Sequence, residues 1–205
     1  MKTRKENQAS LKTAVLLLAA GKSTRMGNIN KLSKRINGTP LLTHCYNEIK
    51  HSNVDQLIVV SSKKNYEQAK NLNNPHPNIA VMPFESKGLG NSISNGMKVV
   101  NSDIESVVIA LSDMPFVSKF HIDLLIKSNK LHNYNGIHRI YDLNNQPGHP
   151  VLFNKIFFSD LLSMKTDKDP KFFFSKNKDL VVKTKVADTS PTFDLDTLSD
   201  WGSFR

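Results

Sequence analysis

The sequence predicts an α/β protein with one domain and a mostly parallel, doubly wound sheet. Short apolar runs that suit buried strands alternate along the chain with segments of helical spacing, which is the pattern of parallel sheets covered by helices. The chain has 205 residues, about the length of a single domain. No internal repeat, low-complexity segment or convincing linker interrupts it.

Seven segments are expected to form strands. Six are apolar runs bounded by turn residues, and the seventh alternates weakly, as an edge strand does. In chain order they are residues 14–19, 57–61, 79–82, 107–111, 137–141, 151–153 and 181–186.

The segments between these strands are expected to be helical. Thr39 is expected to cap the first helix with Pro40 in its first turn, and Ser118 is expected to cap the fourth. In chain order the helices are residues 40–50, 66–72, 88–100, a helix from Ser118 to Leu131, 156–164, 171–176 and 197–201.

The composition favours a globular protein with an anionic ligand. Hydrophobic residues make up 39% and charged residues 22%, which argues against a disordered or fibrous chain. The formal net charge of +10 attracts polyanions, so phosphorylated small molecules and nucleic acid are both candidates. Nucleic acid is the weaker candidate, because no aromatic-basic interleaving or helix-turn-helix signature is present. The single cysteine, Cys45, excludes an intrachain disulfide and is expected in the core.

Residues 1–12 are expected to form a flexible polar arm, and residues 13–205 the folded domain. The basic start followed by the apolar run 14–20 resembles the opening of a secretory signal. That run has only seven residues before Lys22 and Arg25, so a core strand explains it better. No segment approaches the ~20 apolar residues of a membrane helix, so no membrane partner is expected, and the cytoplasm is the expected location.

A glycine-containing loop after the first strand suits phosphate binding. It contains Gly-Lys-Ser but lacks the earlier glycine of a Walker A motif, because Leu16 stands five positions before Gly21. Small residues let backbone N–H groups approach a phosphate, and Lys22, Arg25 and Lys31 add positive charge. The alternative is a tight, solvated turn. A second polar loop, 112–115, follows the fourth strand, and ligands of such sheets bind at the carboxyl ends of strands.

The ordered set of motifs resembles the nucleotidyltransferases that build molybdenum cofactor dinucleotides. The resemblance spans roughly residues 14 to 201, and its Leu-Ala-Ala-Gly and Gly-His-Pro blocks are closer to the cytidylyl-transferring branch. The matching blocks are Leu-Ala-Ala-Gly at 18–21, Arg-Met-Gly at 25–27, Lys31, Pro-Leu-Leu at 40–42, Gly-Asn-Ser-Ile at 90–93, Leu-Ser-Asp-Met-Pro at 111–115, Gly-His-Pro-Val-Leu-Phe at 148–153 and Asp-Leu-Asp-Thr at 194–197. Residues 166–171 differ from the family's Gly-Asp-x-Gly-Ala-Arg block.

The resemblance implies a Rossmann-like three-layer α/β/α fold of the nucleotide-diphospho-sugar transferase type, within the glycosyltransferase-A-like superfamily. It implies transfer of CMP from CTP to the terminal phosphate of the molybdenum cofactor, with release of pyrophosphate and dependence on Mg²⁺. The implied partners are a nucleoside triphosphate, a molybdopterin-type phosphorylated molecule, and a molybdoenzyme or its chaperone. Guanylyl transfer, another phosphorylated acceptor, or a non-catalytic nucleotide-binding protein remain alternatives.

The resemblance also implies which residues act. Arg25, Lys31 and Asp113 are the expected catalytic residues, and His149 is expected to orient the second substrate. The expected nucleotide-binding residues are Leu18, Ala19, Ala20, Gly21, Lys22, Ser23, Gly27, Lys31, Gly90 and Ser92. For Ser92 and Gly90, a plain helix N-cap is the alternative.

Asp113 and Asp196 are the expected metal ligands. Asp113 directly follows an apolar strand, and Mg²⁺ prefers carboxylate, water and phosphate oxygens. Its alternative is a turn residue before Pro115. Asp194 and Asp196 lie two residues apart and therefore on one side of an extended segment. Asp196 or Thr197 could instead cap the last helix, with Asp200 in its first turn.

Overall fold

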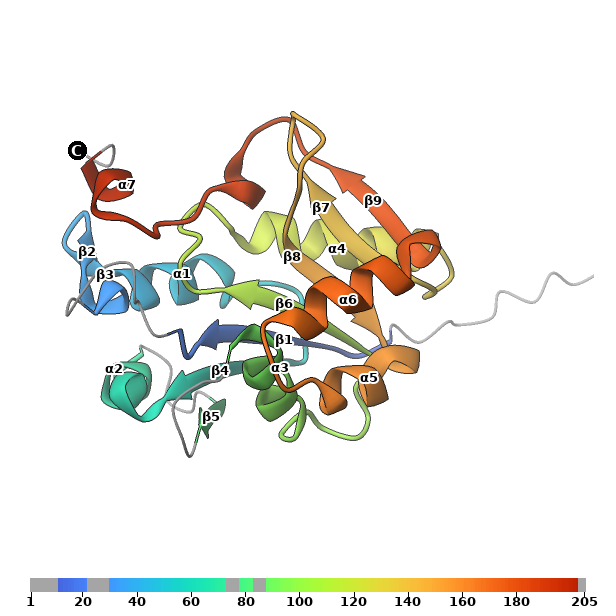
Figure 1. The fold of residues 1–205 in the computed structure, drawn as a ribbon, viewed down its shortest axis with the longest axis horizontal. Coiled ribbons are helices and arrows are strands. Elements are labelled where there is room, and N and C mark those ends of the chain that lie inside the picture. Colours follow the sequence, from blue (N-terminus) through green and yellow to red (C-terminus); the bar gives the residue numbers. More distant parts are fainter. Residues whose placement is uncertain (1–10, 22–29, 73–77, 83–87, 203–205) are drawn as a thin grey trace, which may run out of the picture.

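The computed structural model describes residues 11–21, 30–72, 78–82 and 88–202, and within them a seven-stranded sheet lies between two layers of helices (Figure 1). The strand order is β5-β4-β1-β6-β8-β7-β9. The strands are β1 (Thr13–Ala19), β4 (Gln56–Ser62), β5 (Asn78–Met82), β6 (Ser106–Leu111), β7 (Ile137–Tyr141), β8 (Pro147–Asn154) and β9 (Val181–Lys185). The predicted three-layer α/β/α fold with a mostly parallel sheet is confirmed.

One strand runs against the others. β8 pairs antiparallel with both β6 and β7, whereas the pairs β5–β4, β4–β1, β1–β6 and β7–β9 are parallel. β8 begins at Pro147, although only 151–153 were expected to be strand, because its first residues are prolines and a glycine that usually mark turns. The start of β8 therefore lies at the sheet edge where β6 ends.

The helices divide between the two faces of the sheet. The side chains of β1 alternate between two separate cores, Val15 and Leu17 facing one and Leu16 and Leu18 the other. The first core includes α1 (Leu41–Ile49), α2 (Tyr66–Lys70) and α4 (Lys119–Leu131). The second includes α3 (Leu89–Met97), α5 (Phe158–Ser163) and α6 (Lys168–Lys176). Burial on both faces explains why β1 is apolar throughout.

The first core contains Cys45, which is 2% exposed, so its expected core position is confirmed. The short strands β2 (Arg35–Ile36) and β3 (Thr39–Pro40) and the helix α7 (Leu198–Gly202) lie beyond the carboxyl ends of β1 and β6 (Figure 1). Within the described residues, no helix is long and apolar enough to cross a membrane.

The helix starts differ in one case from the sequence prediction. Thr39 does not cap α1, because it pairs with Ile36 in the β2–β3 ladder; Pro40 occupies the N-cap position, and the N–H of Leu41 donates to the Lys34 carbonyl at 2.8 Å. Ser118 caps α4 as expected, and its N–H donates to Nδ1 of His121 at 3.1 Å. This bond supplies the second half of a capping box.

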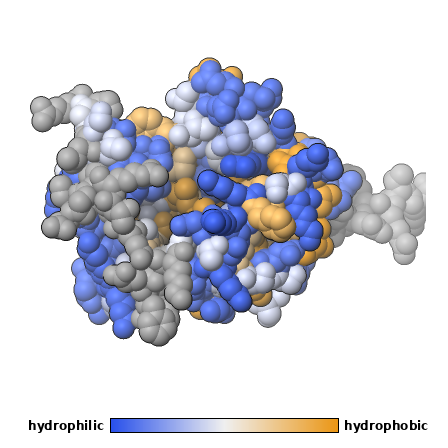
Figure 2. All heavy atoms as spheres, viewed as in Figure 1, coloured by the Kyte–Doolittle hydropathy of each residue, from blue (hydrophilic) through white to orange (hydrophobic). Residues whose placement is uncertain are grey.

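The three consecutive phenylalanines of α6 have different surroundings. The ring of Phe173 packs edge-on against Phe153 and Phe157, with centroids 5.8 and 5.6 Å away. Phe172 is 70% exposed, and hydrophobic atoms are visible over α6 in Figure 2. Phe173 thus anchors α6 to the second core, while Phe172 points to solvent.

A close backbone contact positions the chain that follows β9. A Cβ atom on Gly148 of β8 would lie 2.1 Å from the carbonyl oxygen of Pro191. Only glycine permits this approach, and the turn at Pro191 leads directly into the segment that carries Asp194 and Asp196.

We expect Gly148→Ala to destabilise the protein by about 1–3 kcal/mol, because the new methyl group meets backbone rather than a side chain that can rotate away. Thermal unfolding measures the loss. Gly202→Ala is the matched control, since a Cβ there meets nothing within 4 Å. Equal melting temperatures for the two variants would contradict the close contact.

Candidate active site

The carboxyl ends of β1 and β6 are tied together by one serine. Ser112, which follows β6, donates from its backbone N–H and its hydroxyl to the Leu18 carbonyl, at 3.2 and 2.8 Å. The Ser112 carbonyl accepts from the thiol of Cys45 at 3.4 Å. These bonds hold the turn after β6 against the end of β1, so the position of Asp113 is fixed from both sides.

Two asparagines place Lys31 at the same edge. Asn65 donates to the Ala19 carbonyl at 2.9 Å, and Asn30 donates to the Asn65 side chain at 2.7 Å. The Asn30 side chain also accepts from the N–H of Leu32 at 3.2 Å and so caps the short helix η2 (Lys31–Ser33). This amide chain fixes η2, although no sequence prediction included either asparagine; the preference of Asn for N-caps was the available signal for Asn30.

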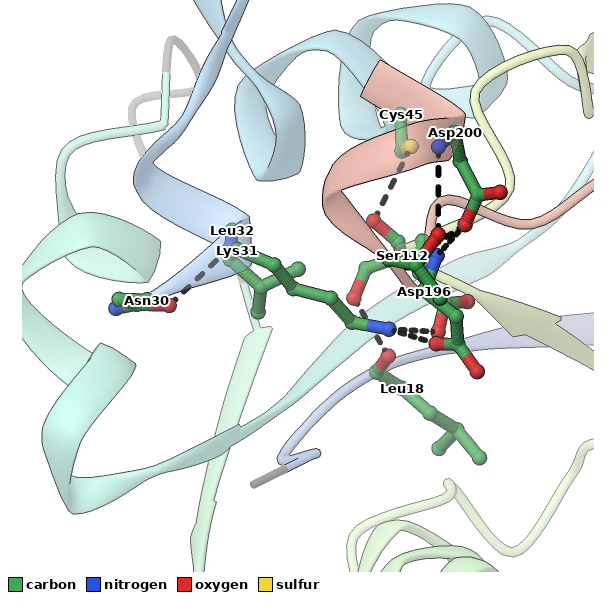
Figure 3. Close-up of polar contacts among 10 residues, drawn as sticks. Leu18, Asn30, Lys31, Leu32, Cys45, Ser112, Asp196 and Asp200 are labelled. Atoms are coloured by element: carbon green, nitrogen blue, oxygen red, sulfur yellow. Dashed lines mark hydrogen bonds and ion pairs between the residues drawn. The ribbon is translucent and has the colours of Figure 1, made fainter. Parts of the chain in front are cut away.

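Lys31 lies between two carboxylates from distant parts of the chain (Figure 3). Its Nζ donates to Oδ2 of Asp113 at 2.7 Å and to Oδ1 of Asp196 at 2.6 Å. Lys31 is only 7% exposed, and burial by itself would lower its pKa, but the Asp113 and Asp196 carboxylates outweigh burial and raise the pKa. The ammonium group therefore stays charged at neutral pH.

The cluster carries more negative than positive charge. Oδ1 of Asp113 is buried and has no hydrogen-bond partner among the described residues. Burial raises the pKa of nearby Asp194, and so do the charges of Asp196 and Asp113. Among the described residues, three carboxylates thus lie near one ammonium group, and an additional cation is electrostatically favoured there.

The donor set fits a divalent cation such as Mg²⁺. Within the described residues no group of three or more His, Cys, Asp and Glu side chains forms a ready-made metal site. Mg²⁺ commonly uses only one or two carboxylates and completes its shell with water and substrate phosphates. Asp113 and Asp196 can supply those two carboxylates, since both reach the same nitrogen atom of Lys31.

Asp196 and Thr197 were both considered as caps of the last helix, and Asp196 also as a metal ligand. The Thr197 hydroxyl accepts from the N–H of Asp200 at 3.3 Å, and the Asp200 carboxylate accepts from the N–H groups of Thr197 and Asp196 at 2.6 and 2.9 Å (Figure 3). Thr197 is therefore the cap of α7, and the Asp196 carboxylate is directed to Lys31. The Asp113 carbonyl accepts from the N–H of Leu195 at 2.9 Å, which anchors the segment.

Much of the predicted nucleotide loop lies outside the described residues. This holds for Lys22, Ser23, Arg25 and Gly27. Leu18, Ala19 and Ala20 are buried, and the carbonyls of Leu18 and Ala19 take part in the bonds described above. At Gly21, a Cβ atom would meet none of the described residues within 4 Å. Nucleotide contact by these residues stays a prediction.

Gly90 and Ser92 have structural surroundings in α3. A Cβ on Gly90 would lie 2.4 Å from the carbonyl oxygen of Thr166. The buried Ser92 hydroxyl donates to the Gly88 carbonyl at 3.2 Å. The Asp167 carboxylate, from the segment that differs from the family pattern, accepts from the N–H of Leu89 at the start of the helix. None of these contacts joins α3 to Lys31, and the predicted nucleotide role of both residues remains to be tested.

His149 lies on β8 beside a small apolar cavity of about 30 Å³. Its Nδ1 atom is buried without a hydrogen-bond partner among the described residues. Burial, together with the nearby Arg139 charge, lowers the pKa of His149 to about 4, although the Ile109 backbone and Asp113 act in the opposite direction. The imidazole is therefore neutral near pH 7, close to both Asp113 and Arg139.

The chain matches a known domain family and several curated proteins. The MobA-like NTP transferase domain matches residues 15–180. The chain is 26% identical over 174 residues to the bifunctional protein GlmU of Buchnera aphidicola, covering 84% of this chain and 36% of that protein. It is 28% identical over 111 residues to 2-C-methyl-D-erythritol 4-phosphate cytidylyltransferase of Clostridium botulinum, covering 52% and 48%. It is 29% identical over 119 residues to a probable molybdenum cofactor guanylyltransferase of Natronomonas pharaonis, covering 58% and 57%.

The chain thus spans between 36% and 57% of the length of these three relatives. Among solved structures, the Rv0371c homologue of Mycobacterium sp. strain JC1 is similar with a TM-score of 0.80 and 23% identity, covering 93% of each chain. Rv0371c of Mycobacterium tuberculosis in complex with manganese has a TM-score of 0.78 and 20% identity, covering 94% of this chain and 97% of that chain. These two likenesses support the fold.

We expect Lys31→Met to destabilise the protein in metal-free buffer by about 2–4 kcal/mol, because two carboxylates lose the ammonium group between them. Mg²⁺ or Mn²⁺ should then raise the melting temperature of this variant more than that of the wild type. The double variant Lys31→Met, Asp113→Asn should lack this gain. An equal metal-dependent gain in the double variant would show that the ion binds elsewhere.

We expect protonation of His149 to destabilise the fold. Its pKa in the folded protein, about 4, is below the ordinary value near 6.5, so its contribution is complete above pH 6.5 and is lost as the pH falls toward 4. The loss is on the order of 3 kcal/mol in urea unfolding between pH 7 and pH 4. His149→Asn should remove that part of the pH dependence, and an unchanged pH profile in this variant would contradict the assignment.

Proposed function

The chain belongs to the MobA-like NTP transferase domain family, and from this premise we propose that it is a metal-dependent nucleotidyltransferase. It transfers a nucleoside monophosphate from a nucleoside triphosphate to the phosphate of a small acceptor, and pyrophosphate leaves. The observation that carries the proposal is the cluster of Lys31, Asp113 and Asp196 at the carboxyl ends of β1 and β6.

The chemistry of the cluster suits this reaction. A phosphate monoester is largely dianionic near neutral pH, so the attacking group needs no general base. The requirement is electrostatic, because two anions must approach and charge grows on the leaving pyrophosphate. Lys31 stays protonated and presents N–H donors to phosphate oxygens, while Asp113 and Asp196 would hold a divalent ion. When bound, that ion supplies positive charge to the triphosphate.

A manganese complex of the structurally similar Rv0371c supports dependence on a divalent metal. Manganese and magnesium both accept carboxylate and phosphate oxygens, so Mg²⁺ is proposed as the working ion. The Lys31 ammonium group sits where both carboxylates converge, and it would give up at least one of these contacts when a metal is bound. The released N–H groups would then be available to the triphosphate.

CTP and the molybdenum cofactor are the proposed substrates. The Leu-Ala-Ala-Gly and Gly-His-Pro blocks support cytidylyl transfer, and the relatives include a protein named as a molybdenum cofactor transferase. That relative is named a guanylyltransferase, and another relative is a cytidylyltransferase for a different phosphorylated acceptor. Transfer from GTP or another triphosphate, or to another phosphorylated acceptor, therefore remains the second candidate. A molybdoenzyme or its chaperone is the proposed receiver of the product.

The arrangement proposed for the chain is one nucleotidyltransferase domain over residues 13–205 with a polar arm over 1–12. Arg25, Lys22, Ser23 and the glycines of the loop are proposed to bind the triphosphate. The non-catalytic alternative rests on the different 166–171 block, whose Asp167 accepts from the backbone of α3. It predicts that a triphosphate binds in calorimetry and that no pyrophosphate is released.

A panel of nucleoside triphosphates with Mg²⁺ or Mn²⁺, with and without molybdopterin, tests the function by pyrophosphate release. We expect release with CTP that requires the acceptor, and a loss of at least about 100-fold in Asp113→Asn and Lys31→Ala. Lys127→Ala and Glu48→Gln, which change exposed residues on α4 and α1, are the matched controls. Full turnover in either cluster variant would overturn the site assignment.

A further inference from the structure

Arg139 carries a partly buried positive charge close to the active-site edge of the sheet. It lies on β7, two residues after Ile137, whose side chain belongs to the core formed with α3, α5 and α6. Alternation along the strand therefore places both side chains on that face. The Arg139 Nε donates to the Gly148 carbonyl at 3.1 Å, and its Cζ lies 4.5 Å from the ring centroid of Phe174 on α6.

No carboxylate balances this charge among the residues that the structure describes. A guanidinium group has five N–H donors. Two of them reach the carbonyls of Gly148 and Pro147, the second at 3.5 Å. Burial lowers the pKa of Arg139, and the nearby Tyr141 phenol opposes this effect only in part. Lys31, in contrast, has two carboxylates as partners. A partly buried guanidinium group with free donors is stabilised by an anion.

The surroundings of Arg139 connect it to His149. Phe174 contacts the guanidinium group and also lines the small cavity that His149 borders. His149 is the residue whose Nδ1 is buried without a partner, and its pKa responds to both Arg139 and Asp113. Arg139, Phe174 and His149 thus combine a cation, an aromatic face and a buried polar atom without a partner among the described residues.

We propose that Arg139 binds the anionic group of the acceptor, a phosphomonoester, with its guanidinium group held in place by the Phe174 ring and the Gly148 carbonyl. The planar fork of arginine accepts two phosphate oxygens at once, and stacking on an aromatic ring limits its rotation. This inference rests on the proposed function, because it assigns the acceptor side of the same site.

Phenyl phosphate is the probe, since it has a phosphomonoester on an apolar planar body. Its binding to the protein is measured by ligand-observed NMR. The ring signals of His149 are recorded in a separate protein-observed spectrum. We expect Arg139→Met to weaken binding at least tenfold and Arg139→Lys to weaken it severalfold, because lysine keeps the charge and loses the fork. Lys127→Met, with the same loss of charge on the opposite face, should bind as the wild type does. Melting temperatures confirm that each variant is folded.

Wild-type affinity in Arg139→Met, or no binding of phenyl phosphate to the wild type, would overturn the inference. In the complete reaction, Arg139→Met should raise KM for the acceptor at least tenfold and leave KM for the triphosphate unchanged. Binding that depends on Arg139 in a protein that releases no pyrophosphate would uphold the anion site and overturn the proposed function. Turnover with an acceptor KM that is insensitive to Arg139→Met would uphold the proposed function and overturn the anion site at Arg139.

Discussion

The ammonium group of Lys31 joins three parts of the chain that are far apart in sequence. Asp113 is 82 positions and Asp196 165 positions away from it, and both carboxylates meet the same nitrogen atom. Burying one carboxylate without a cation costs several kcal/mol, so each of these groups needs the others in the folded protein. The position of the C-terminal segment over the sheet edge follows from this ion-pair cluster.

Uncharged contacts also hold these groups together. Ser112 attaches the turn after β6 to the end of β1, and Asn65 and Asn30 extend from β1 to the helix that carries Lys31. Gly148 lets the turn at Pro191 approach β8 closely enough for the chain to continue to Asp196. The arrangement of Lys31, Asp113 and Asp196 therefore depends on neutral hydrogen bonds, and on the absence of a Cβ atom at Gly148, as much as on the charges. A site supported in this way holds its carboxylates and its ammonium group in fixed positions.

The two faces of the sheet bury different kinds of residue. The face covered by α1, α2 and α4 contains the larger set of buried residues and the inert Cys45 thiol, whose pKa burial raises. The face covered by α3, α5 and α6 holds His149, whose buried Nδ1 lacks a partner among the described residues, and Arg139, which donates to the carbonyls of Gly148 and Pro147.

The sequence by itself determined the fold class, the order of the helices and strands of the main sheet, and the placement of the loops that carry Lys31 and Asp113 at one edge of that sheet. These follow from local patterns: apolar runs mark strands, and polar residues that follow parallel strands collect at one sheet edge. Only the tertiary structure decided that β8 runs antiparallel from Pro147, that Thr39 leaves α1 uncapped, and that Asp196 faces Lys31 while Thr197 caps α7. It also decided the positions of Asn65 and Arg139, because a lone polar residue has no periodic pattern and its partners lie on other strands and loops. Long-range hydrogen bonds and ion pairs select among local alternatives that are similar in energy, and such contacts are not encoded in residue spacing.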